Sequence, residues 1–172
     1  MLNKNEQVKT VFDLIKKFLP QKIYGLCSEW AEEKRYMTES ETPLPGPFRF
    51  TNSPYTKEIL DCNSKSSEVR EVAVMKAAQL GFTTAVIENS VAYTIDVDPC
   101  PSMFVMPSDT LSRTYKQLKI DKLIDNSGLR PKIFAQTLDK KTKNTGNTAM
   151  LIQFINGFLK FGSANNGASL RN

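Results

Sequence analysis

The spacing of apolar residues changes along this chain, and each change marks an element that the sequence predicts. Apolar positions recur at helical spacing over residues 6–19, and Pro20 ends this predicted amphipathic helix. A second short helix is expected over residues 26–37, with Ser28 as its N-cap. We interpret residues 1–25 either as a helix packed on its own domain or as a separate segment that binds a partner.

Prolines then interrupt the helical pattern. Residues 38–54 contain four prolines and a glycine. Because proline fixes φ and has no amide donor, this stretch predicts an extended segment that lies over the surface of the domain. Helical spacing returns over residues 55–63.

A strand, a turn and a helix follow. The apolar run at residues 72–75 predicts a buried strand, and residues 83–97 predict a helix that ends before Pro99 and Pro101. The positions of this helix that we expect to face inward are Ala85, Val86, Asn89, Ala92 and Tyr93.

The same pattern then repeats. A second buried strand is predicted at residues 103–106, and Ser108 is expected to cap a helix over residues 109–126 that Gly128 and Pro131 close. Strands that alternate with helices predict an α/β fold with a parallel sheet.

A β-hairpin is predicted near the end of the chain. Residues 148–155 and 158–163 have strand character, and Asn156-Gly157 between them is a strong signal for a two-residue turn.

Composition narrows the possible chemistry. The 172-residue chain contains no histidine, which excludes Ser-His-Asp triads, Cys-His nucleophiles and His-ligated metals. Its three cysteines, Cys27, Cys62 and Cys100, form no CxxC pair, so we expect reduced and mostly buried thiols in a cytoplasmic protein. We also expect no signal peptide and no membrane span.

Positive charge is concentrated in the last third of the chain. Residues 113–172 contain 11 Lys and Arg against 3 Asp, whereas residues 1–112 contain 12 basic and 15 acidic residues. This asymmetry favours a polyanionic partner such as nucleic acid, although a solvated basic face is the alternative. The candidate contacts are a helical stripe and a loop cluster with one further arginine: Arg113, Lys116, Lys119, Lys122, Lys140, Lys141, Lys143 and Arg171.

The strongest candidate for a chemical site lies between the first predicted strand and its helix. A strand that turns tightly into a helix directs unpaired backbone N–H groups and the helix dipole at one point, where they can bind phosphate. Compared with the pattern GxxxxGK[ST], Lys76 occupies the first glycine position, and Thr83 occupies the hydroxyl position that faces Mg²⁺. An ordinary strand-to-helix turn remains the alternative. The candidate loop comprises Lys76, Ala77, Ala78, Gln79, Leu80, Gly81, Phe82, Thr83 and Thr84.

Three ordered blocks of this sequence resemble the phage terminase large subunit GpA (lambda-like) family. They are EWAEEKRYMTESETPLPGPFRFTNSPY at residues 29–55, EVAVMKAAQLGFTT at residues 71–84, and GNTAMLIQFINGFLKFGSANNGASLR at residues 146–171. The resemblance implies the ATPase motor of a viral DNA-packaging enzyme, with a helicase-like P-loop fold, ATP and Mg²⁺. It implies a mainly parallel sheet flanked by helices with a C-terminal β-hairpin, in a partial ATPase domain over residues 26–172 without a nuclease domain.

The same resemblance assigns roles to individual residues. Lys76 becomes the phosphate ligand, Gly81 the loop glycine and Thr83 the Mg²⁺-side hydroxyl. Phe48 or Tyr55 is expected to stack on the adenine. Double-stranded DNA, a small terminase subunit, the portal of the procapsid and, for the full-length protein, further copies of itself are the implied partners, in the host cytoplasm.

The family's Walker B carboxylates are expected after the last residue of this sequence. We interpret Asp96 and Asp98 as the solvated end of a helix rather than as substitutes for them. The chain is therefore expected to bind nucleotide weakly and to hydrolyse it poorly, if at all. The alternatives are a non-catalytic remnant that binds nucleotide, DNA or a small terminase partner, and an unrelated helicase-like P-loop NTPase.

Overall fold

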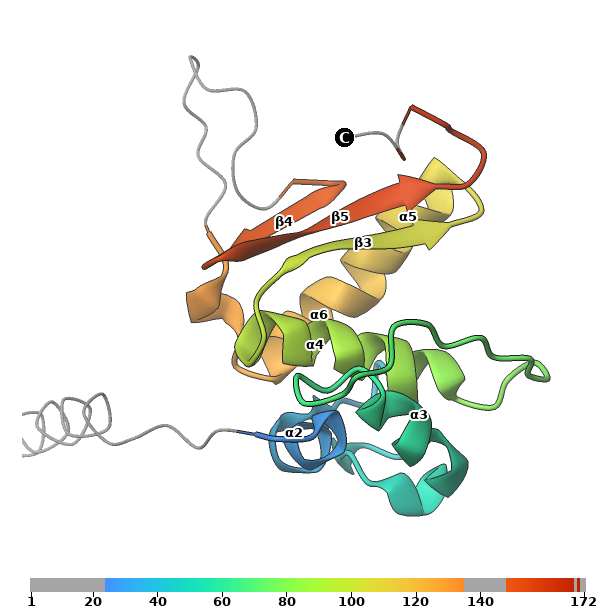
Figure 1. Cartoon of the computed structure of the whole chain (residues 1–172), viewed down its shortest axis with the longest axis vertical. Coiled ribbons are helices and arrows are strands. Elements are labelled where there is room, and N and C mark those ends of the chain that lie inside the picture. The colour runs from blue at the N-terminus through green and yellow to red at the C-terminus, as the bar shows by residue number, and fades with distance from the viewer. Residues whose placement is uncertain (1–23, 135–147, 169, 171–172) are drawn as a thin grey trace, which may run out of the picture.

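The upper part of the molecule is a three-stranded sheet with helices on one face (Figure 1). The computed structural model describes residues 24–134, 148–168 and 170. The strand order is β3 (Pro101–Met106), β5 (Gly157–Ser163) and β4 (Leu151–Phe154). β5 pairs parallel with β3 and antiparallel with β4. The fold is therefore mixed α/β with a small mixed sheet, in which β3 and β5 are parallel and the expected C-terminal hairpin supplies the antiparallel pair.

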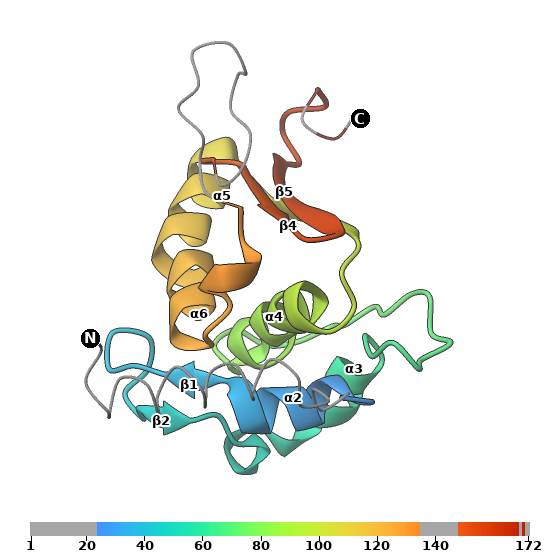
Figure 2. The ribbon, with the colours of Figure 1, turned by 90° about the vertical axis from the view of Figure 1, so that its left-hand side faces the viewer.

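Helices cover the rear face of the sheet and lie beneath it (Figures 1 and 2). The rear face is covered by α5 (Asp109–Tyr115), which continues through a π-helical turn (Lys116–Ile120) into α6 (Asp121–Asn126). Beneath the sheet, a π-helical turn (Thr83–Glu88) leads into α4 (Asn89–Asp96). These two helical runs confirm the helices predicted over residues 83–97 and 109–126.

The lowest layer is built from short elements around the proline-rich segment. It contains α2 (Cys27–Lys34), α3 (Lys57–Asp61) and an antiparallel pair of two-residue strands, β1 (Tyr36–Met37) and β2 (Gly46–Pro47). Short 3-10 turns span Phe50–Asn52 and Pro54–Thr56, and a third spans Arg130–Lys132. The helices predicted over residues 26–37 and 55–63 are thus present but shorter.

One hydrophobic core joins the layers. Trp30 of α2, Tyr93 of α4, Leu123 of α6 and Phe161 of β5 are almost completely buried in the same cluster. All five residues predicted to face inward from the helix after residue 83 are buried. The 3.6-residue period therefore predicted this buried face correctly.

The start of α2 differs from the prediction. Ser28 is not its N-cap, because Leu26 occupies that position without a side-chain hydrogen bond. Instead the Cys27 N–H donates to Ser64 Oγ at 2.8 Å, and the Ser28 N–H donates to the carboxylate of Asp61 at 2.8 Å. The first amides of α2 are thus satisfied by residues more than thirty positions away, which local sequence cannot reveal.

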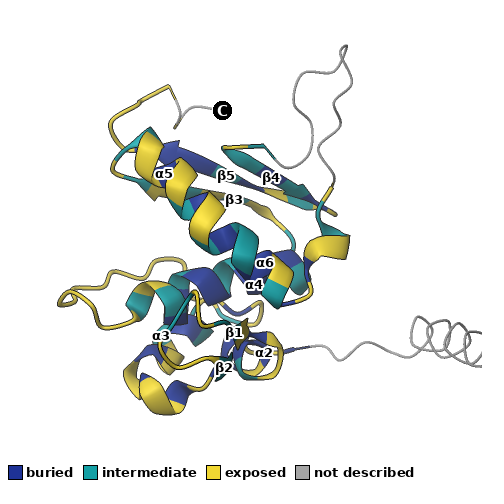
Figure 3. Cartoon of the chain, turned by 180° about the vertical axis from the view of Figure 1, so that it is seen from behind, coloured by how far each residue is buried: buried dark blue, intermediate teal, exposed yellow. Residues whose placement is uncertain are grey.

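The predicted buried strand at residues 72–75 is also absent. Every residue from 68 to 80 is exposed, and this segment forms the long loop between α3 and α4 (Figures 1 and 3). An apolar run becomes a strand only when a neighbouring strand pairs with its backbone, and within the described residues none pairs with residues 72–75. The strand predicted at 103–106 does form, but Met103 and Val105 are exposed rather than buried.

The ends of the sheet and helix elements follow the predicted signals closely. Ser108 caps α5 by accepting the Leu111 N–H, and Gly128 closes the run after α6 at φ +68°. The predicted hairpin forms, with Phe154 opposite Gly157, so its turn lies at Ile155 and Asn156, one residue earlier than expected. A Cβ on Gly157 would lie 2.5 Å from the ring of Phe154, which explains why glycine opens β5.

All three cysteines are free, as expected, but they differ in exposure. Cys27 is buried, which raises the pKa of its thiol to about 12, whereas Cys100 is exposed. The expectation of mostly buried thiols is therefore wrong for Cys100. None of the helices formed by the described residues has the length and apolar character that a membrane span requires.

Candidate functional site

A groove of about 370 Å³ separates the proline-rich segment from the loop that precedes α4. Phe48, Arg49 and Tyr55 line it from the proline-rich side, and Gln79, Gly81 and Thr84 line it from the loop side. Two parts of the chain that the sequence identified separately, the predicted adenine segment and the predicted phosphate loop, therefore form opposite walls of one groove.

The loop wall bends sharply into the helix. Gln79 and Gly81 both have positive φ, at 58° and 68°. The helix begins directly after them, with the Ala85 N–H bonded to the Gly81 carbonyl at 2.9 Å. A helix leaves its first amides without an intrahelical carbonyl partner, so the start of this helix supplies free backbone donors next to the groove. Such a turn is suited to an anion.

Tyr55 joins the two walls. Its hydroxyl donates to the carbonyl of Leu80 at 2.7 Å, although its side chain is about half exposed. Phe48 lies deeper, buried with its ring edge-on to Phe50 at a centroid distance of 4.9 Å. Of the two predicted adenine-stacking residues, Tyr55 is thus exposed at the groove and Phe48 forms part of its floor.

Leu80 also lines the groove, whereas the remaining predicted phosphate-loop residues, Lys76, Ala77, Ala78, Phe82 and Thr83, do not. Lys76 is exposed, with its Nζ 3.4 Å from the carbonyl of Ala77 and 6.0 Å from the centre of the Phe82 ring. Thr83, the predicted Mg²⁺-side hydroxyl, is exposed and does not line the groove, whereas its neighbour Thr84 does. Ala77 and Ala78 are exposed in the same loop.

A carboxylate, Glu41, also lines the groove, and its charge is compensated. One of its oxygens accepts from Arg35 Nη2 at 3.0 Å, and the other accepts from the Thr38 N–H at 3.0 Å and the Asn126 amide at 2.6 Å. Burial alone raises the pKa of Glu41, but the Thr38 N–H and the charge of Arg35 outweigh burial and hold the pKa below its usual value.

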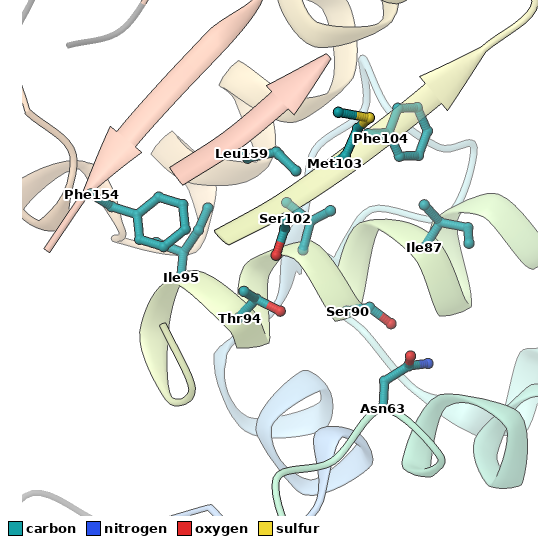
Figure 4. Close-up of a pocket in the computed structure, with 11 residues that line it drawn as sticks. Asn63, Ile87, Ser90, Thr94, Ile95, Ser102, Met103, Phe104, Phe154 and Leu159 are labelled. Atoms are coloured by element: carbon teal, nitrogen blue, oxygen red, sulfur yellow. The ribbon is translucent and has the colours of Figure 1, made fainter. Parts of the chain in front are cut away.

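A second cavity, of about 280 Å³, lies between α4 and the sheet (Figure 4). Its walls are apolar side chains such as Ile87 and Leu159, with uncharged polar groups from Asn63, Ser90 and Thr94. Because no ionisable side chain lines it, this cavity lacks the acids, bases and cations that phosphate chemistry requires.

The predicted basic stripe on the helix after Ser108 is interrupted. Lys116 is buried, and its Nζ bonds both carboxylate oxygens of Asp121 at 2.9 and 3.0 Å. Arg113 is exposed, Lys119 is half-buried, and Lys122 donates to Ser40 Oγ at 3.2 Å. The expectation of a continuous stripe is therefore wrong at Lys116. Lys140, Lys141, Lys143 and Arg171 lie outside the described residues.

The two acids at the end of α4 differ from each other. Asp96 is not solvated as expected, because its carboxylate accepts from Trp30 Nε1 at 2.7 Å and forms an ion pair with Lys132 at 2.7 Å. Asp98 is half exposed and pairs with Lys65 at 3.6 Å. Asp96 thus links α2, α4 and the turn after α6. In the part of the chain that the structure describes, no group of three or more Cys, Asp or Glu could hold a metal ion.

Sequence reasoning missed Arg35, Glu41 and Glu88. Arg35 and Glu88 are buried ionisable residues, but neither lies in a sequence motif that marks it as functional. The one available signal was the position of Glu88, an acid on the helical face that otherwise faces the core, four residues after Thr84.

Comparison with known proteins identifies the family. The family model described as phage terminase large subunit gpA, ATPase domain, matches residues 42–172. This range includes the three-stranded sheet and all residues that line the groove except Met37 and Glu41. No curated protein and no solved structure matches the chain. The resemblance found in the sequence is confirmed: the chain belongs to the family of phage terminase large subunit gpA ATPase domains.

Proposed function

We propose that this chain binds ATP with Mg²⁺ in the groove between the proline-rich segment and the loop at residues 76–84. The observation that carries this proposal is that the two segments expected at the two ends of the nucleotide line one groove of about 370 Å³. Membership of a terminase ATPase family supports the choice of ATP. The domain would be of the P-loop type, with its nucleotide-binding part within residues 26–172.

The residues divide between the two ends of the nucleotide. Tyr55 offers an exposed aromatic ring for the base, beside Phe48. The backbone donors of the bend after Gln79 and Gly81 face the phosphates, since this is where the helix begins. Lys76 brings a flexible cation from the start of the same loop, and a lysine acts on phosphate as a point charge.

Thr83 is the hydroxyl that we assign to the Mg²⁺ side. A bound Mg²⁺ neutralises phosphate charge. Glu41 is a wall residue rather than a general base, because both of its oxygens already accept hydrogen bonds. The proposal therefore assigns nucleotide binding to the groove and no catalytic carboxylate.

The experiment is equilibrium binding of a fluorescent ATP analogue with and without Mg²⁺. Lys76→Ala is expected to weaken binding about tenfold or more, because a charge-assisted contact to phosphate is lost. Arg70→Ala is the matched control: it removes an exposed cation from the same loop, six residues earlier, and should change binding less than about twofold. Equal losses in both variants, or no binding by the unmodified chain, would overturn the proposal.

In the packaging role that the family suggests, double-stranded DNA is the partner that this chain would contact directly, alongside a small terminase subunit and the portal. Arg113 and Lys119 are the described cations of the helix after Ser108 that remain available, since Lys116 is paired with Asp121. Replacing both by alanine should weaken DNA binding and reduce its dependence on salt, measured by titration at several ionic strengths. A salt-independent interaction would contradict this assignment.

A further inference from the structure

Next to the groove lies a cluster of three buried charged side chains, Arg35, Glu41 and Glu88. Arg35 Nη2 donates to Glu41 Oε1 at 3.0 Å and to Glu88 Oε2 at 2.9 Å. The Arg35 side chain is fully buried, and each carboxylate is 2% exposed. One guanidinium nitrogen thus bridges acids that are 47 positions apart in the sequence.

One acid of this cluster lies in a wall of the groove, and the other contacts a residue of the opposite wall. Glu41 itself lines the groove on the side of the proline-rich segment. Glu88 lies one helical turn after Thr84, which lines the opposite wall, and Thr84 Oγ1 lies 3.5 Å from Glu88 Oε1. The Tyr115 hydroxyl donates to the same oxygen at 3.0 Å, and this tyrosine belongs to α5.

Stability alone does not account for this arrangement. A buried ion pair is expensive to desolvate, and an apolar replacement of similar volume is often as stable. Here a single cation faces two carboxylates, and Arg35 Nε and Nη1 are buried without a hydrogen-bond partner among the described residues. The cluster therefore costs desolvation energy that its own bonds do not fully return, which points to a role in fixing geometry.

We propose that Arg35 is a positioning residue for the nucleotide groove. It holds Glu41 of one wall and Glu88, which contacts Thr84 of the other wall, and so sets the separation between the base-binding side and the phosphate-binding side. This inference rests on the proposed binding of ATP in the groove. A ligand that touches both walls depends on their separation, whereas a ligand that touches one wall does not.

The test compares three ligands, each in competition with the fluorescent ATP analogue. ATP spans both walls, adenosine contacts only the base side, and inorganic triphosphate contacts only the loop side. For Arg35→Met we expect ATP affinity to fall about tenfold, with the affinities for adenosine and triphosphate changed less than about twofold. Arg35→Lys, which keeps the charge, should recover part of the ATP affinity.

A purely structural role would give a different pattern. Loss of folded protein lowers the apparent affinity for all three ligands by the same factor. Trp30→Phe is the matched control, since it removes a hydrogen bond from the same helix to Asp96, away from the groove. This control should leave the ratio of ATP to adenosine affinity unchanged even where thermal unfolding shows lower stability.

The outcomes separate the inference from the proposed function. If the unmodified chain does not bind ATP, both are wrong. If it binds ATP and Arg35→Met changes all three affinities equally, or none of them, the positioning role is wrong and nucleotide binding stands. If Arg35→Met does not fold, Glu88→Gln carries the same test, because it keeps the shape of the acid while removing its charge, and it must lower ATP affinity selectively.

Discussion

Two irregular segments meet at the groove, and they are held in very different ways. The proline-rich segment, residues 38–54, is anchored by the buried side chains of Phe48, Phe50 and Ser53. The segment at residues 68–80 is exposed along its whole length. Figure 3 shows this contrast as a loop of exposed residues that extends away from the buried layers.

The difference lies in the tertiary anchors. In the proline-rich segment, the Phe48 N–H bonds the Arg35 carbonyl at 2.9 Å, and Arg49 Nη1 bonds the Glu32 carbonyl at 2.6 Å. In the segment at residues 68–80, Tyr55 reaches the Leu80 carbonyl, and Lys76 bonds its own neighbour. A segment without regular hydrogen bonding is therefore held in place where it buries apolar side chains and bonds distant backbone atoms. The proline-rich segment meets this condition, whereas residues 68–80 do not.

The largest difference that we expect between the two segments is in how much a substitution lowers the stability of the fold. Phe50→Ala should lower the free energy of unfolding by about 3–5 kcal/mol, because it empties a buried site in the core. Val72→Ala, in the exposed segment, should change it by less than about 0.5 kcal/mol. Urea unfolding followed by circular dichroism measures both, and similar values for the two variants would contradict the contrast.

Proteolysis should distinguish the same two segments by rate. We expect trypsin to cleave after Arg70 and Lys76 at least about tenfold faster than after Arg49, because cleavage requires the local chain to leave the body of the protein. Mass spectrometry of the early fragments measures all three sites in one digest. Added ATP should slow cleavage after Lys76 and leave Arg70 unchanged, and early cleavage at Arg49 would show that the proline-rich segment is not anchored.

The bend between the two segments should respond to backbone substitutions. Gly81→Ala should cost about 1 kcal/mol, because φ +68° is strained for a residue with a Cβ, although no atom lies within 4 Å of the added carbon. Gln79→Gly should stay within about 0.5 kcal/mol, since relief of strain at φ +58° offsets the freedom added to the unfolded chain. Urea unfolding measures both, and an unaffected Gly81→Ala would mean that the bend does not require this φ.

The smallest expected effect is the pH dependence from Glu41. Its pKa is lower in the folded protein than the usual 4.5, so the unfolded chain binds more protons near this pH and stability falls as pH drops below about 4.5. Glu41→Gln should make the free energy of unfolding fall less steeply as pH decreases. Glu29→Gln, on the exposed side of α2, is the control and should leave this pH dependence unchanged. Urea unfolding between pH 3 and pH 6 tests this, and parallel curves for Glu41→Gln and the unmodified chain would contradict it.

Much of the fold was predictable because its signals are local. The helices at residues 83–96 and 109–126 follow from apolar spacing, and Ser108 and Gly128 mark the ends of the second as expected. The hairpin was correct except for the position of its turn, which lies one residue earlier because Phe154 pairs with Gly157.

The two segments that line the groove were identified from the sequence, whereas the contacts between them were not. Phe48 and Tyr55 line it from one side, and Gln79, Leu80, Gly81 and Thr84 of the loop at residues 76–84 line it from the other, while Lys76 does not; their roles in nucleotide binding stay predictions. The cluster of Arg35, Glu41 and Glu88 was not identified, because its members are separated in the sequence and each resembles a surface charge. Lys116 was wrongly assigned to an exposed basic stripe, because the sequence does not reveal that it is buried and paired with Asp121.

Residue order alone determined the helical faces, the hairpin, the absence of histidine chemistry and the family to which the chain belongs. The helical faces and the hairpin follow from local periodicity and turn chemistry, and the missing histidine follows from composition. The family follows from the resemblance of three ordered sequence blocks and from the match to the family model. None of these requires a distant partner. Tertiary structure decided that residues 72–75 lie exposed, that Asp61 and Ser64 satisfy the start of α2, and that Arg35 bridges Glu41 and Glu88. A strand, a helix start and a buried charge all need partners, and only the folded chain brings those partners together.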